Sequence, residues 1–220
     1  MSLLKIIEIA SDKLLLNKKQ LFESLVEMSY QFVILGKIEK KYQHLQAVYD
    51  EFSVAYVNEV QDKPFRDVLG ELMAELNVLC NGKYSRKAQH FTPQELSEAV
   101  SAMLGKPKEA DHQTVSDICC GSGSLVLAEM NKRVDSGYKG TLSLILNDLD
   151  SFVCKVATIQ IEFNNLIHVK NQYDLSYIIY NHDALLEYNL FCNGMVDDSK
   201  VVGCSVPKNI TEHVIEQEFK

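Results

Sequence analysis

The chain has 220 residues, which is enough for one medium domain or two small ones. Its content of 46% hydrophobic and 24% charged residues is ordinary for a globular protein and allows a core of real size. The formal net charge of −8 argues against a chain that grips a long phosphate backbone on its own, although it leaves room for a local basic patch.

Cysteine usage and hydropathy point to the cytoplasm. None of the six cysteines belongs to a C-x-x-C pair, which argues against a zinc ribbon or a thioredoxin motif, and we expect no metal site. Free thiols in apolar surroundings fit a reducing cytosol. No signal peptide is evident, and no stretch is long and apolar enough to span a bilayer. We therefore expect a cytoplasmic protein without a membrane partner.

Residues 1–82 are predicted to form a small helical bundle. Apolar residues recur at helical spacing over residues 3–10 (closed or extended by 14–16), 18–35, 38–58 and 65–78. Gly36 is a suitable stop for the second helix, and Pro64 suits the first turn of the fourth. Residues 83–220 are expected to form a second domain, against which the bundle can pack.

A basic and aromatic stretch joins the two parts. Residues 81–93 read NGKYSRKAQHFTP and set three positive charges among aromatic rings, at Lys83, Arg86, Lys87, Tyr84, His90 and Phe91. The three basic residues are a candidate local patch for DNA, whereas the plain alternative is a solvated loop. Thr92 is a good N-cap and Pro93 a good first residue for a helix over residues 94–104, so capping alone explains those two.

The most informative stretch is residues 114–129, TVSDICCGSGSLVLAE. Residues 114–118 are predicted to form a buried strand that ends near Asp117, and a helix begins at Ser124 after the tight turn of Gly121 and Gly123. A strand, a glycine turn and a helix make the first half of a nucleotide-binding unit, in which the helix N-terminus attracts an anionic group.

The ligand that this turn indicates is S-adenosylmethionine. Val126 stands where a dinucleotide fingerprint needs its third glycine, and no G-K-[ST] sequence is present. The carboxylate of Asp117 can pair with the ammonium of S-adenosylmethionine, while N–H groups of the turn and the helix receive its carboxylate. The alternative is an ordinary strand–helix turn with an aspartate near the cap.

Three more strands are predicted, over residues 142–146, 176–181 and 200–206, with a helix over residues 152–164. Asp148 follows the first of these strands, about two dozen residues beyond the glycines, where an acid receives ribose hydroxyls in nucleotide-binding folds. The alternative is an aspartate that caps the next helix, a role that suits Asp150 better. Residues 211–220 are predicted to form a short helix or to be disordered.

Two motifs in order resemble those of the N6-adenine DNA methyltransferases, above all the modification subunit of type I restriction systems and its phage and mobile-element relatives. The family's G-Q-[FY]-[FY]-T-P stretch is matched by Ala88-Gln89-His90-Phe91-Thr92-Pro93, and its D-P-A-C-G-[ST]-G motif by Asp117-Ile118-Cys119-Cys120-Gly121-Ser122-Gly123. The chain departs from these patterns at Ala88, His90, Ile118 and Cys119. Upstream, Asp67-Val68-Leu69-Gly70-Glu71-Leu72 resembles the family's D-x-x-G-x-x helix, and the likeness runs from Pro64 to Leu186.

The resemblance implies an α/β fold in which the helical bundle precedes a Rossmann-like, three-layer (α/β/α) methyltransferase sheet that is cut short. It implies S-adenosylmethionine as the cofactor, with Asp148 at the ribose and Asp183 near the adenine, although His182 replaces the family's glycine. The implied cofactor-binding residues are Phe91, Thr92, Pro93, Asp117, Cys119, Gly121, Gly123, Asp148 and Asp183. An incomplete sheet edge also leads us to expect a homodimer or an assembly with restriction-modification subunits.

The catalytic motif of the family is missing. Its [DN]-P-P-[FY] sequence accepts the hydrogens of the adenine amine and stacks the flipped base, yet the chain has four prolines and no adjacent pair. Pro207-Lys208-Asn209 does not match it, so no catalytic residue is assigned. Three hypotheses follow: a DNA adenine methyltransferase that works with a partner chain, a non-catalytic cofactor-binding accessory or decoy subunit, and a structural protein with an empty pocket.

Overall fold

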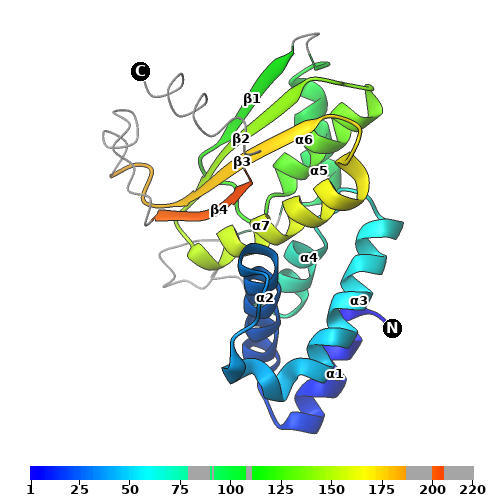
Figure 1. Cartoon of the computed structure of the whole chain (residues 1–220), viewed down its shortest axis with the longest axis vertical. Helices are drawn as coiled ribbons and strands as arrows, with labels where there is room; N and C mark the ends of the chain where they lie inside the picture. The colour runs from blue at the N-terminus through cyan, green and yellow to red at the C-terminus, as the bar shows by residue number, and fades with distance from the viewer. Residues whose placement is uncertain (79–89, 91, 108–110, 187–199, 206–220) are drawn as a thin grey trace.

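The computed structural model describes residues 1–78, 90, 92–107, 111–186 and 200–205 (Figure 1). Three groups of predictions lie outside these residues, namely the basic patch of Lys83, Arg86 and Lys87, the ring of Phe91, and the tail over residues 211–220. The described chain is a mixed α/β protein, in which helices fill the N-terminal third and a four-stranded sheet follows.

Helices occupy the N-terminal third, where the apolar spacing predicted them. They are α1 (Leu3–Leu14), α2 (Lys18–Leu35), α3 (Gln46–Asp62) and α4 (Val68–Glu75). Ser2 and Asn17 cap α1 and α2 through their side chains. As predicted, α2 ends at Gly36, whose φ of 64° is left-handed.

The third and fourth helices differ from the predicted ones in their boundaries. The helix predicted over residues 38–58 is a short 3-10 helix, η1 (Lys40–Leu45), followed by α3. The helix predicted from residue 65 begins only at Val68, because Phe65 has a φ of 59° and so leaves the helical region. Pro64 therefore precedes a turn rather than opening α4, and Asp67 is the N-cap.

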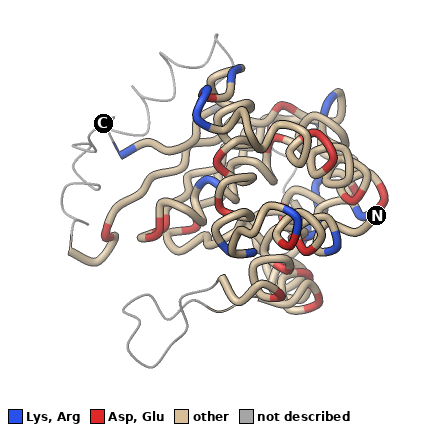
Figure 2. Tube along the Cα trace, turned by 90° about the horizontal axis from the view of Figure 1, so that it is seen from below, with Lys and Arg blue, Asp and Glu red and all other residues tan. Residues whose placement is uncertain are grey.

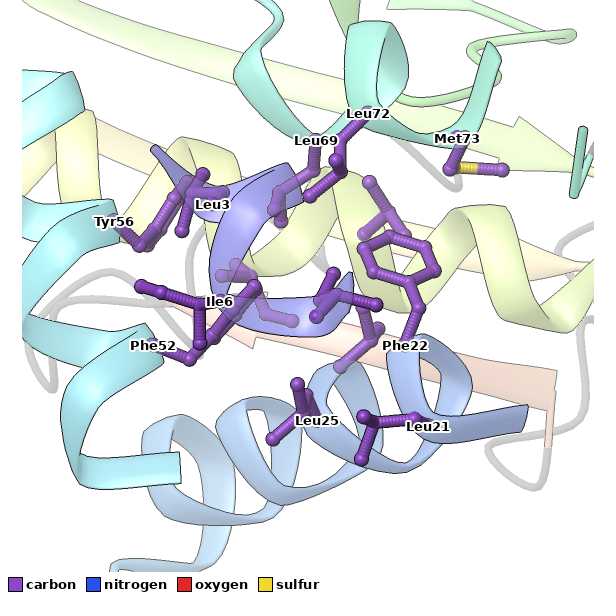
Figure 3. Packing of buried hydrophobic residues seen from close by; sticks show 14 of the residues in the cluster. Leu3, Ile6, Leu21, Phe22, Leu25, Phe52, Tyr56, Leu69, Leu72 and Met73 are labelled. Atoms are coloured by element: carbon purple, nitrogen blue, oxygen red, sulfur yellow. The ribbon is translucent and has the colours of Figure 1, made fainter. Parts of the chain in front are cut away.

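One hydrophobic cluster joins these four helices to a later helix, α7 (Ser151–Asn164), as the close-up in Figure 3 shows. Phe22 of α2 is fully buried and meets Phe152 edge-on, with ring centroids 6.1 Å apart. The cluster members that α7 contributes are Val153, Val156 and Ile159. The N-terminal helices thus share a core with a helix of the sheet, and the division of the chain at residue 82 stays a prediction.

The sheet has the order β1-β2-β3-β4 (Figure 1). Its strands are β1 (His112–Asp117), β2 (Thr141–Asp148), β3 (Asp174–Asn181) and β4 (Val201–Ser205). The first three are parallel, whereas β4 runs antiparallel along β3. All four lie where the sequence predicted strands, but the reversed direction of β4 was not predicted. The prediction that the first strand is buried was wrong, because β1 is the last strand at one end of the described sheet and its residues are exposed or half-buried.

Helices α6 (Ser124–Asp135) and α7 cover the same face of the sheet. Leu142, Leu144 and Leu146, alternate residues of β2, share one cluster with Leu127 of α6 and Ala157 of α7. Helix α5 (Gln94–Met103) packs on α6 rather than on the sheet. Within the described ranges all helices lie on this side (Figure 1), so the third layer of the predicted sandwich is not found among these residues.

The described helices also bear on membrane insertion. None of them combines the length and the apolarity needed to cross a bilayer.

The contact of Gly203 with α7 generates a prediction about stability. A Cβ at residue 203 would lie 2.4 Å from Oγ1 of Thr158, which is fully buried. We expect Gly203→Ala to lower the free energy of unfolding by about 1–3 kcal/mol through overpacking, as measured by urea unfolding. Adding Thr158→Ala should recover most of this loss. A Gly203→Ala variant as stable as the wild type would contradict the packing.

Candidate functional site

The parallel strands bring their carboxyl ends to one edge of the sheet. β1 ends at Asp117, β2 at Asp148 and β3 at Asn181, and Asp148 pairs with Asn181 in the register of β2 and β3. Open α/β sheets bind their ligands at the edge where the strands end. The loops that follow these three strands therefore define the candidate site.

Asn147 fastens the three strand ends to one another and is only 3% exposed. Its Nδ2 donates to the carbonyls of Ile118 (3.0 Å) and His182 (3.3 Å), and its Oδ1 accepts the N–H of His182 (3.2 Å). Its own carbonyl accepts the N–H of Cys120 at 2.9 Å. Sequence reasoning missed Asn147, because its importance lies in hydrogen bonds to distant backbone groups, which local spacing does not reveal.

The glycine turn joins β1 to α6. Gly121 and Gly123 have φ values of 54° and 94°, in the left-handed region that residues with a Cβ avoid. The N–H of Gly123 donates to the carbonyl of Cys120 (2.9 Å), and the N–H of Leu127 donates to the carbonyl of Gly123 (2.8 Å), which opens α6. The first N–H groups of a helix have no acceptor within it, so this end of α6 suits an anionic ligand group.

Two carboxylates flank this turn. Oδ2 of Asp148 accepts the N–H of Gly121 (2.9 Å), and Oδ1 of Asp117 accepts the N–H of Cys119 (3.0 Å). Burial raises the pKa of Asp117, and the charge of Asp148 raises it further. Neither carboxylate forms an ion pair with a described residue. The two neighbouring carboxylates, Asp117 and Asp148, would therefore stabilise a cationic ligand group placed between them and the solvent.

Helix capping is the role of Asp150 rather than of Asp148. Asp150 is the N-cap of α7, and its Oδ1 accepts the N–H of Phe152 at 3.0 Å. Asp148 instead binds the turn at Gly121 and also accepts the N–H of Asp150 at 2.9 Å. The capping role therefore belongs to Asp150, and the contact of Asp148 with ribose hydroxyls stays a prediction.

The Thr92-Pro93 segment lies against the first residue of α6. The hydroxyls of Ser124 and Ser97 are hydrogen-bonded to each other. Ser124 Oγ also lies 3.3 Å from the carbonyl of Thr92, and Ser97 Oγ lies 3.4 Å from the carbonyl of Pro93. The predicted cap was wrong, because Pro93 and not Thr92 is the N-cap of α5 and no side chain caps it. The structure thus brings this segment to the glycine turn by way of two serines.

The remaining predicted residues lie at the same edge or outside the described chain. Asp183 follows β3, and its Oδ1 accepts the N–H groups of Leu185 and Leu186, both at 3.0 Å. Cys119 is exposed at the surface. Partial desolvation of its thiol and the charges of Asp148 and Asp117 raise the pKa of the thiol, which disfavours the thiolate. Phe91 lies outside the described residues.

Comparison with known protein families identifies the class of this chain. The N-6 DNA methylase family matches residues 65–197, which is more than half of the chain. The chain therefore belongs to the N-6 DNA methylase family, and the resemblance seen in its motifs is confirmed at the level of the family. No curated protein and no solved structure gives a significant match.

The proximity of the two acids generates a prediction about titration. Asp148→Asn removes a negative neighbour, so we expect the pKa of Asp117 to fall. It should still stay above the ordinary value, because burial is the larger cause of the rise. A carboxyl-carbon NMR titration of both proteins measures the difference. An Asp117 that titrates identically in the two proteins would mean that the carboxylates do not interact.

Proposed function

We propose that this chain is the S-adenosylmethionine-binding part of a DNA adenine N6-methyltransferase of a restriction-modification or phage system. The single observation that carries the proposal is the pair of acids, Asp117 and Asp148, placed beside the glycine turn in a member of the N-6 DNA methylase family. A type I modification subunit is the subtype that the motifs favour.

The charges of the cofactor match the groups at this edge. The ammonium of S-adenosylmethionine would be held by Asp117, and its carboxylate by N–H groups of the glycine turn and α6. The ribose hydroxyls would donate to Asp148, which accepts two backbone N–H groups and keeps further lone pairs for them. By resemblance, Asp183 would lie beside the adenine, with Phe91, Thr92, Pro93 and Cys119 completing the pocket. The bound cofactor would supply a methyl group activated on its sulfonium.

We propose further that the isolated chain binds the cofactor without appreciable methyl transfer. The sequence contains no adjacent prolines, hence no [DN]-P-P-[FY] motif. The direction of β4 supports this, because Val201 pairs with Tyr180 near the carboxyl end of β3 and Ser205 pairs with Tyr177, farther from it. The last residue of β4 therefore lies away from the edge where the family's motif would be expected to follow its fourth strand.

A partner chain would then supply the missing parts. Figure 2 shows Lys and Arg residues mixed with Asp and Glu residues along the described trace, which gives little support for a broad DNA-binding face. DNA would be reached through a restriction-modification subunit or through Lys83, Arg86 and Lys87. The alternative is a non-catalytic accessory or decoy subunit, and the two differ in whether the assembled complex methylates adenine.

Cofactor binding is tested by calorimetry with S-adenosylmethionine. We expect heat of binding from the wild type and an affinity weaker by about tenfold or more in Asp117→Asn, which loses the charge that faces the ammonium. Since the pKa of Asp117 is raised, wild-type affinity should fall as the pH is lowered toward that pKa, and the variant should lack this fall. Asp174→Asn, an exposed change at the start of β3, is the matched control. Absence of binding by the wild type would refute the proposal.

Catalysis is tested separately, with labelled S-adenosylmethionine and unmodified DNA. We expect no transfer above background from the purified chain alone, because no side chain is assigned to accept the hydrogens of the adenine amine. Mass spectrometry of the digested DNA identifies any N6-methyladenine formed. Appreciable adenine methylation by the chain alone would overturn this second part of the proposal and leave cofactor binding intact.

A further inference from the structure

A carboxylate lies buried directly behind the glycine turn. Asp67, the N-cap of α4, is 1% exposed. Its Oδ1 accepts the N–H of Gly70 (2.9 Å) and Nε2 of Gln160 (2.7 Å), and its Oδ2 accepts the hydroxyl of Ser122. Ser122 is the residue between the two glycines of the turn. One side chain thus caps a helix of the N-terminal part and holds the candidate cofactor site.

Gln160 of α7 completes the connection and is fully buried. Besides its bond to Asp67, its Nε2 donates to the carbonyl of Ser122 (2.8 Å), and its Oε1 accepts the N–H of Leu69 (3.0 Å). Ser122 therefore forms two hydrogen bonds to this network, from its hydroxyl to Asp67 and at its carbonyl from Gln160. These bonds form a closed ring that joins α4, the turn and α7.

The sequence at the start of α4 allows this close approach. A Cβ on Gly70 would lie 2.3 Å from Oδ2 of Asp67, so only glycine leaves the carboxylate room to turn toward Ser122. This explains the Asp67-x-x-Gly70 spacing. The N–H of Gly70 donates to the Asp67 carboxylate, and the missing side chain leaves space for that carboxylate. A helix cap without this second task would not need glycine there.

Burial of the Asp67 carboxylate costs free energy, which a contact that only held helices together would not require. Burial raises the pKa of Asp67, and the three donors around it act in the opposite direction. No Lys or Arg of the described residues forms an ion pair with it. An apolar contact between α4 and α7 would join the helices at lower cost, but it would not fix the orientation of a turn. Hydrogen bonds to a buried charge do fix orientation, since their loss is expensive.

We infer that Asp67 is a positioning residue for the cofactor site, which acts through Ser122 to hold the turn of Gly121 and Gly123 in its binding conformation. It does not contact the ligand, because it is buried beneath the turn. The inference rests on the proposed cofactor binding at this turn. Its consequence is that docking of α4, and with it the N-terminal helices, is coupled to cofactor affinity.

Three variants separate this role from general damage. Asp67→Ala removes both carboxylate oxygens and with them all three hydrogen bonds. Ser122→Ala removes only the hydroxyl on the turn, so it serves where Asp67→Ala fails to fold. Asp67→Asn is the conservative variant: its amide oxygen can accept from Gly70 and Gln160, and its Nδ2 can donate to the Ser122 hydroxyl, which then acts as acceptor. Asn164→Ala is the matched control, since it removes the 2.8 Å bond between Asn164 Oδ1 and the N–H of Phe65 and the 2.9 Å bond from Asn164 Nδ2 to the main-chain carbonyl of Gln160, but leaves the side chains of Asp67, Ser122 and Gln160 in place.

Two readouts are required. The first is amide hydrogen exchange of residues 120–123 without ligand, and the second is the affinity for S-adenosylmethionine by calorimetry. We expect faster exchange and affinity weaker by about tenfold in Ser122→Ala and Asp67→Ala, with Asp67→Asn restored to near wild type and Asn164→Ala unchanged.

Each other result contradicts the inference. Unchanged exchange of the turn in Ser122→Ala would mean that Asp67 does not position it, even if the wild type binds the cofactor. Equal losses in Asp67→Asn and Asp67→Ala would assign the effect to charge rather than to hydrogen-bond geometry. Equal losses in Asn164→Ala would assign it to loosened helix docking. A wild type that does not bind S-adenosylmethionine would defeat the proposed function, while the exchange data would still judge the positioning of the turn.

Discussion

The glycine turn between β1 and α6 is held by a carboxylate on each side. Asp148 accepts the N–H of Gly121, and Asp67 accepts the hydroxyl of Ser122. The first acid comes from the end of β2 and the second from the N-terminus of α4, so the turn is hydrogen-bonded both to the sheet and to the N-terminal helices. The remaining features of the candidate site, including the end of α6 and the Thr92-Pro93 segment, are arranged around this turn.

Much of the fold could be predicted from the sequence, because hydrophobic period and turn residues are local signals. The helices of the N-terminal third and the four strands lie close to their predicted positions. The misses have specific causes. Phe65 adopts a left-handed φ in spite of its bulk, with its N–H bound to Asn164, a residue 99 positions away that no local pattern reveals. The direction of β4 depends on pairing with β3 across a long connection, which is likewise invisible to local spacing.

The candidate site was predictable in part for the same reason. Asp117 and Asp148 end strands, and Gly121 and Gly123 lie in the turn after the first of these strands, so their place at the carboxyl edge came from element order alone. Asn147 and Gln160 could not be recognised, since their importance lies in hydrogen bonds to distant backbone groups. Asp67 was noticed only through family likeness, and its contact with Ser122 emerges from packing between α4 and α7. Second-layer polar residues are generally found in this way, because they bind other protein groups and carry no ligand-type signature.

The common core of the N-terminal helices and α7 has a consequence for any shortened version of this protein. A polypeptide that began after residue 82 would expose Phe152, Val153, Val156 and Ile159 to water as a continuous apolar stripe along α7. Strips of that kind promote self-association and aggregation. The first four helices therefore cover the apolar stripe of α7 within the same chain. A fragment made without them would need another polypeptide or a detergent on this stripe to remain soluble.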